Sequence, residues 1–159
     1  SPQSHFLPSI IARRFGKLKS GDPMKRIGEY FCVFSLGGLL YSFIEILWRD
    51  HTHWTMGLTG GAALLGIYAV NEKYKRLPLF LRCLCGCGII TALEFFVGLL
   101  VNKIFRLHVW DYSHLPFNIF GQICPLFSFA WFLLSFPACH LCDGVQMLLF
   151  RAALRKNTL

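Results

Sequence analysis

The sequence has 159 residues, of which 55% are hydrophobic and only 15% are charged, and its mean hydropathy is +0.51. This balance exceeds that of soluble globular domains and predicts a polytopic membrane protein. The formal net charge of +8 does not indicate a nucleic-acid partner, because the basic residues lie between long apolar runs, where the lipid bilayer is the expected partner.

Residues 1–26 combine proline, glycine, serine and basic residues, and they predict a basic cytoplasmic extension, either a short interfacial helix or a poorly ordered tail. The first membrane span is expected at 27–48, because roughly 20 apolar residues cross a ~30 Å hydrocarbon core. Glu45 is the charge embedded in it. The second, shorter span is expected at 54–70. It is rich in glycine and alanine, which favours a place in the centre of the bundle.

The third span is expected at 78–101 and carries Glu94, on the order of 10 Å below the membrane interface. The polar connection that follows contains aromatic and basic residues, so it is expected to lie along the membrane surface or to enter the bundle. The fourth span is expected at 121–142, kinked by Pro125 and Pro137. Residues 144–159 predict an amphipathic helix on the cytoplasmic membrane surface.

The distribution of basic residues predicts the orientation. Thirteen lysines and arginines lie before the first span, between the second and third, at the foot of the third, or after the fourth, against three on the opposite side. This excess predicts a multi-pass protein of the cell membrane, inner or plasma, with both termini in the cytoplasm. Glu45, Glu94 and the loop after the third span would then lie on the outer side.

Ionisable residues inside membrane segments are candidates for function. Glu45 and Glu94 are expected at similar depth, where Asp111 could cap them from the loop. Such a site could bind a cation, accept protons, or hold a cationic or polyhydroxyl substrate. The alternative is that both glutamates are structural ties to basic residues or loop amides. The residues expected to shape the site are Trp110, Tyr112, Asn118 and Gln122.

Two further chemistries are open. The histidines His51, His53, His108 and His114 are candidate metal ligands, although their spacing is not specific. Cys139 and Cys142 have the C-x-x-C spacing of redox or metal pairs. The sequence contains no P-loop, nucleophile elbow or H-E-x-x-H pattern, so it favours a protein that is not an enzyme and assigns no cofactor.

Several runs resemble one family of small bacterial membrane proteins. The most specific run extends from Trp110-Asp111-Tyr112-Ser113 to Gly121-Gln122-Ile123-Cys124, with further matches at 45–49, 53–56 and 91–95. Over about residues 29–143 the chain is similar to the Putative ABC-transporter type IV, or CmpB-type, family. This resemblance implies an integral membrane component of a transporter. The chain departs from the family pattern at 139–143, where relatives tend to have two acidic residues.

Together these observations predict an all-α four-helix transmembrane bundle with an outer interfacial or re-entrant loop. We expect a transport-related, permease-like component with an outward-facing acidic site. Four spans are few for a complete alternating-access pathway, so a homo-oligomer or a complex with other membrane subunits is expected. The alternative is a non-transport scaffold or partner-binding subunit, and a membrane thiol-redox enzyme is a third interpretation.

Overall fold

The computed structural model of the protein describes the backbone of residues 23–156 and the side chains of residues 23–152. Within this range it is all-α, with one isolated β-bridge between Ile119 and Ile123 and no strand. The elements are α2 (Pro23–Arg49), α3 (Trp54–Lys73), α4 (Leu79–Gly98), the π-helical turn η1 (Leu99–Ile104) and α5 (Pro125–Lys156).

Three segments of the described chain are long and apolar enough to cross a membrane, namely Pro23–Arg49, Leu79–Ile104 and Pro125–Ala152. The expected second span, α3, is not among them, although it has 20 residues. Its glycines and threonines lower its hydropathy, because they contribute little apolar surface. The structure therefore supports a multi-pass membrane protein with three clear candidate spans and a fourth, less apolar helix.

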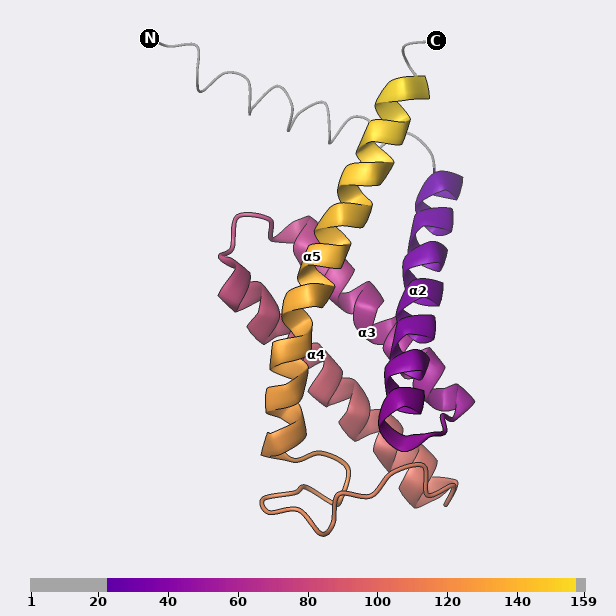
Figure 1. Ribbon diagram of the computed structural model, residues 1–159, viewed down its shortest axis with the longest axis vertical. Coiled ribbons are helices and arrows are strands. Elements are labelled where there is room, and N and C mark those ends of the chain that lie inside the picture. The colour runs from indigo at the N-terminus through magenta and orange to yellow at the C-terminus, as the bar shows by residue number, and fades with distance from the viewer. Residues whose placement is uncertain (1–22, 157–159) are drawn as a thin grey trace.

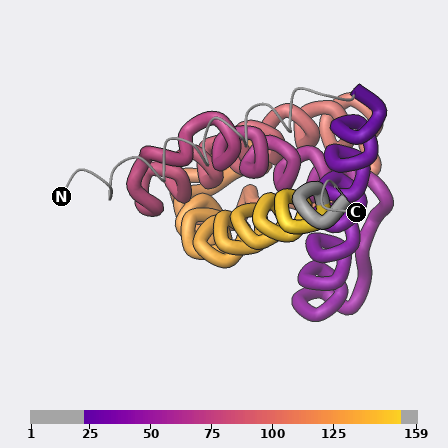
Figure 2. The backbone as a smooth tube through the Cα atoms, turned by 90° about the horizontal axis from the view of Figure 1, so that it is seen from above, coloured from indigo at the N-terminus to yellow at the C-terminus, as the bar shows by residue number. Residues whose placement is uncertain are grey.

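Helix α3 is the centre of the bundle, as its small residues predicted. It contacts α2, α4 and α5, and it lies beside α5 in both views of the molecule (Figures 1 and 2). A Cβ atom on Gly60 would lie 2.2 Å from Cβ of Tyr41 and 2.9 Å from the carbonyl oxygen of Gly37. No side chain fits there, so glycine lets α2 and α3 approach backbone to backbone.

Helices α4 and α5 each bury one narrow stripe. On α4 the buried positions recur every three or four residues, at Cys83, Gly86, Ile90, Glu94 and Gly98. On α5 the stripe is Trp131, Ser135, Cys139, Cys142 and Gln146. The remaining faces expose large apolar side chains, as a helix surrounded by lipid requires.

The fourth predicted span differs from the structure at both ends. Pro125 is the first residue of α5 rather than an internal kink, because proline fits the first helical turn, where its missing N–H is not needed. Only Pro137 lies inside the helix. The amphipathic helix expected from residue 144 is the continuation of α5, which is one helix from Pro125 to Lys156. Within it, Asp143 pairs with Arg82 of α4 at 3.0 Å.

Of the expected N-terminal extension at 1–26, residues 1–22 lie outside the described part of the chain. Residues 23–26 form the first turn of α2. In Figure 1, α2 begins and α5 ends at one end of the bundle, and the connection between η1 and α5 lies at the opposite end. We call this connection, residues 105–124, the end loop. It contains four non-glycine residues with positive φ, at Arg106, His108, Phe117 and Phe120.

Candidate functional site

Glu94 is the most deeply buried carboxylate of the described chain, with 1% of its surface exposed. It lies on the buried stripe of α4, facing α5. The indole Nε1 of Trp131 donates a hydrogen bond to its Oε2 atom at 2.6 Å. The other oxygen, Oε1, is buried and has no hydrogen-bond partner among the described residues. The carboxylate is therefore held on one side and unsatisfied on the other.

Aromatic side chains surround this carboxylate. The ring of Tyr41, from α2, stacks on Trp131 with centroids 5.6 Å apart. Tyr112, from the end loop, stacks on Phe127 with centroids 4.5 Å apart. Burial, together with the nearby charge of Glu94, raises the pKa of the Tyr112 hydroxyl, which stays protonated at neutral pH. The end loop thus brings a hydroxyl group to the vicinity of the buried carboxylate.

Glu45 is engaged by residues close to it in the chain. It forms an ion pair with Arg49 one turn later on α2, and it accepts a hydrogen bond from the hydroxyl of Thr52 at 2.5 Å. Arg49 also donates to the carbonyl oxygen of Val109 at 3.0 Å. The pair therefore joins the end of α2 to the following turn and to the end loop. Both Glu45 oxygens are engaged, so Glu45 does not form an open acidic site with Glu94.

Asp111 does not cap the two glutamates. It is exposed, and its Oδ1 accepts hydrogen bonds from the backbone N–H of Ser113, at 2.9 Å, and from the Ser113 hydroxyl. These bonds lower the pKa of the Asp111 carboxyl group below its ordinary value. They also explain why residue 121 is glycine with φ of +70°, since a Cβ there would lie 2.6 Å from Asp111 Oδ1. Asp111 is a turn-forming residue of the end loop.

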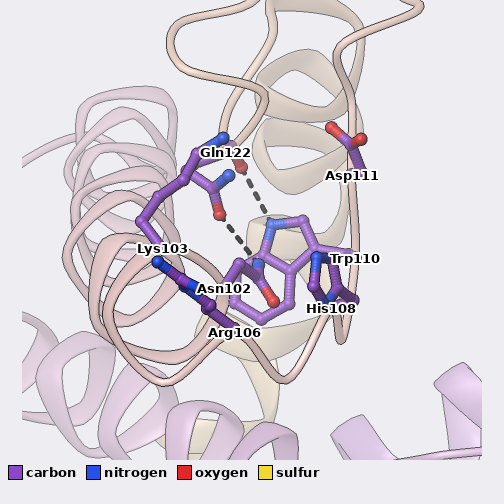
Figure 3. A pocket seen from close by; sticks show the side chains of 7 residues that line it. All are labelled: Asn102, Lys103, Arg106, His108, Trp110, Asp111 and Gln122. Carbon is purple, nitrogen blue, oxygen red and sulfur yellow. Dashed lines mark hydrogen bonds between the residues drawn. The ribbon is translucent and has the colours of Figure 1, made fainter.

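Asn118 and Gln122 fix the shape of the end loop. The Asn118 amide donates to the carbonyl oxygen of Leu115 at 2.7 Å and accepts from the N–H of Gly121 at 3.0 Å. Gln122 is buried, and its Oε1 accepts from Asn102 of η1 at 2.8 Å, while Trp110 Nε1 donates to its backbone carbonyl at 3.1 Å (Figure 3).

Asn102 in turn accepts from the N–H of Val109 at 2.7 Å. Trp110, Gln122 and Asn102 thus form a buried network that attaches the end loop to η1.

This network forms the inner wall of a cavity of about 300 Å³ at the end of the bundle. Three basic side chains, Lys103, Arg106 and His108, line it together with Asp111, which stands apart from them in Figure 3. Trp110, Asp111 and Gln122, expected to join the glutamates, lie here instead. The structure therefore divides the predicted site into two parts. One is the buried carboxylate of Glu94 with the aromatic side chains around it, and the other is a mainly basic pocket at the surface.

The other histidine and cysteine candidates lie apart. His51 contacts the carbonyl oxygen of Arg49, and His53 caps the N-terminus of α3. His114 is exposed. Among the side chains of residues 23–152, no three His, Cys, Asp or Glu gather as metal ligands would.

Cys139 and Cys142 are both buried free thiols, and the Sγ atom of Cys139 contacts Sγ of Cys83 at 4.0 Å. This thiol contact joins α4 to α5 and does not involve Cys142.

Sequence reasoning missed Trp131, the partner of Glu94. A tryptophan in the middle of an apolar run could have indicated it, because a buried indole N–H seeks an acceptor and Glu94 is the deepest one available. Sequence reasoning also missed the basic pocket. The backbone path that brings Lys103, Arg106 and His108 to one cavity includes left-handed residues at 106 and 108, which leave no clear pattern in the sequence.

The fold and this site define a multi-pass helical membrane protein with a half-satisfied buried carboxylate beneath an ordered end loop. Residues 29–156 match the family described as Putative ABC-transporter type IV, and the chain belongs to that family. No curated protein and no solved structure matches the chain.

Proposed function

We propose that the protein is a transport-related, permease-like membrane component in which Glu94 exchanges a proton or a small cation. The observation that carries this proposal is the Oε1 atom of Glu94, which is buried without a partner among the described residues. A buried carboxylate oxygen with no donor is costly, so it is stabilised by a proton or a cation. Ionisable groups at membrane depth with this character mark ion and proton pathways.

The surroundings of Glu94 suit a group that changes its charge. Trp131 holds one oxygen in place, so the carboxylate keeps its orientation when the other oxygen gains or loses a proton. Tyr112 belongs to the end loop, and a change of charge on Glu94 alters its electrostatic environment. The end loop would therefore respond to the state of the carboxylate, which is how a transport component couples a site to its entrance.

The second candidate function is a membrane scaffold or partner-binding subunit that transports nothing itself. The pairing of Glu45 with Arg49 and Thr52 favours it, because a transport site was expected to need both glutamates facing one wet space. In this function Glu94 would only fix α4 against α5 through Trp131. The two functions differ in one respect: only the first makes the protein respond to protons or cations through Glu94.

The proposed membrane arrangement has four crossings, with α3 as the second, both ends of the chain in the cytoplasm and the end loop outside. The 20-residue length of α3 and its position between the apolar helices support this arrangement. Reporter fusions in the turn between α2 and α3 and in the turn between α3 and α4 test it. Opposite locations support a crossing by α3, and the same location refutes it.

The functional test compares wild type with Glu94→Gln and Glu45→Gln in detergent. Thermal stability is measured against pH and against a panel of small mono- and divalent cations. A proton or cation that stabilises wild type in a concentration-dependent manner, leaves Glu94→Gln unmoved and still stabilises Glu45→Gln supports the proposal. If no ligand or proton dependence distinguishes Glu94→Gln from Glu45→Gln, the scaffold function takes its place. Cross-linking in membranes tests the homo-oligomer separately.

A further inference from the structure

The pocket beside the end loop carries a net positive charge that no carboxylate of the described chain neutralises by contact. Lys103, Arg106 and His108 all line the cavity of about 300 Å³, and none of them forms an ion pair with the side chains of residues 23–152. The one acidic lining residue, Asp111, already accepts two hydrogen bonds from Ser113. The pocket is therefore suited to an anionic group.

The back wall of this pocket is rigid. Asn102 and Gln122 are buried, and their hydrogen bonds to each other, to the N–H of Val109 and to the carbonyl oxygen of Phe120 use most of their capacity. These amides form the wall, and the basic side chains of Lys103, Arg106 and His108 form the rim. Such a combination binds an anion through charge at the rim while the wall determines how deeply it enters.

A second cavity lies on the other side of the same segment. It is an apolar groove of about 470 Å³ between α3 and α4, which also reaches α2. Leu58 and Ala62 line it from α3, and Leu93, Val97 and Leu100 line it from α4 and η1. Leu58 is 51% exposed, so the groove is open to the surroundings of the helices. An acyl chain has the shape and the polarity that such a groove accepts.

One short stretch of chain contributes to both cavities. Phe105 and Leu107 line the apolar groove, whereas Arg106 and His108 line the basic pocket. Arg106 and His108 have positive φ values of 55° and 50°. Left-handed backbone at non-glycine residues is uncommon and costly, and it is concentrated at ligand-binding sites. Here the left-handed residues lie in a segment whose successive side chains line the apolar groove and the basic pocket in turn.

We propose that these two cavities together bind one anionic phospholipid, with its phosphate-bearing headgroup in the basic pocket and one acyl chain in the apolar groove. Because residues 105 to 108 line the two cavities alternately, a molecule that fits both must carry an anionic group close to an apolar chain, which is the chemistry of a glycerophospholipid. Trp110 and the basic side chains at the end of a membrane helix are the residue types found at headgroup level. The proposal does not depend on any proton or cation exchange at Glu94.

The experiment measures binding of short-chain phosphatidylglycerol to the full chain in a non-ionic detergent, by the concentration dependence of thermal stability. Phosphatidylcholine with the same chains tests the need for net negative charge, and glycerol phosphate tests the headgroup without chains. The variants are Lys103→Gln with Arg106→Gln, which removes two rim charges, and Leu58→Trp, which narrows the groove at an exposed position. Arg76→Gln, in the turn after α3, is the control for loss of a basic charge elsewhere.

Wild type and Arg76→Gln are expected to bind phosphatidylglycerol equally and more tightly than phosphatidylcholine. The double variant should bind about thirty-fold more weakly, given the usual worth of two basic side chains at an anionic surface. Leu58→Trp should weaken lipid binding but not the smaller effect of glycerol phosphate. The proposal is overturned if Arg76→Gln loses as much as the double variant, if both lipids bind alike, or if glycerol phosphate binds as tightly as the lipid.

Discussion

Replacing Gly98 by alanine tests whether the end loop is attached to α4 as described. Gly98 is the last residue of α4, and a Cβ atom there would lie 2.4 Å from Oε1 of Gln122 and 2.9 Å from Cζ2 of Trp110. Real Cβ contacts are never so short, so the Gln122 side chain must move. Gln122 cannot move without disturbing its hydrogen bond to Asn102, at 2.8 Å.

The expected cost follows from three contributions. Overpacking of a close contact costs about 1–3 kcal/mol. Loss or lengthening of the hydrogen bonds that Gln122 makes with Asn102 and Trp110 costs about 1–2 kcal/mol. Alanine in place of glycine in a helix returns up to about 1 kcal/mol. We therefore expect Gly98→Ala to reduce the free energy of unfolding by about 1–5 kcal/mol, with the loss concentrated in the end loop.

The matched control is Gly88→Ala, on the same helix, where a Cβ atom would meet nothing within 4 Å. It should be neutral or slightly stabilising. Equilibrium unfolding in mixed detergent measures both variants, and hydrogen exchange reports protection across residues 105–124. Gly98→Ala should lose protection there and keep it in α3. Equal stability and equal protection in the two variants would refute the described attachment of the loop.

Three further predictions concern the carboxylates. Trp131→Phe removes the indole hydrogen bond to Glu94 and should cost about 1–3 kcal/mol. Glu94→Gln should recover part of this loss in the double variant, and additive losses in a double-mutant cycle would contradict the contact. Arg49→Gln should lower the free energy of unfolding by about 1–3 kcal/mol, because it leaves the charge of Glu45 without its ion-pair partner. A further Glu45→Gln should reduce this loss. An unchanged Tm for Arg49→Gln would show that the ion pair does not stabilise the protein. The pKa of Asp111 is lowered in the folded protein, so the stabilisation from its carboxylate is complete above the ordinary aspartate pKa and is lost as the pH falls through the lower folded value. The difference in Tm between wild type and Asp111→Asn should therefore shrink from pH 7 to pH 3. A constant difference would exclude this linkage.

The membrane character and the central place of α3 could be predicted from the sequence, since both depend on local composition. Runs of apolar residues long enough for a bilayer gave α2, α4 and α5, and the glycines near 60 indicated close packing. The expected kink at Pro125 is absent because this proline is the first residue of α5, where its missing N–H is not needed, and α5 continues past residue 144 as one helix. Asp143 within it pairs with Arg82 of α4.

The residues predicted to form one acidic site lie in separate places in the structure. The burial of Glu94 could be predicted from its depth, which is a property of one segment. The expectation that Asp111 would cap Glu45 and Glu94 was wrong in its geometry, because it depended on the direction of a loop whose path is determined by hydrogen bonds to Ser113 and by left-handed residues.

The sequence by itself determined that this chain belongs in a membrane and that a carboxylate lies deep within one of its helices, because hydropathy and helical length are summed residue by residue. Only the tertiary structure decided which carboxylate is neutralised and which is left with an unsatisfied oxygen. Pairing of charges depends on distances between segments far apart in the chain, such as Glu94 and Trp131, and packing alone sets those distances.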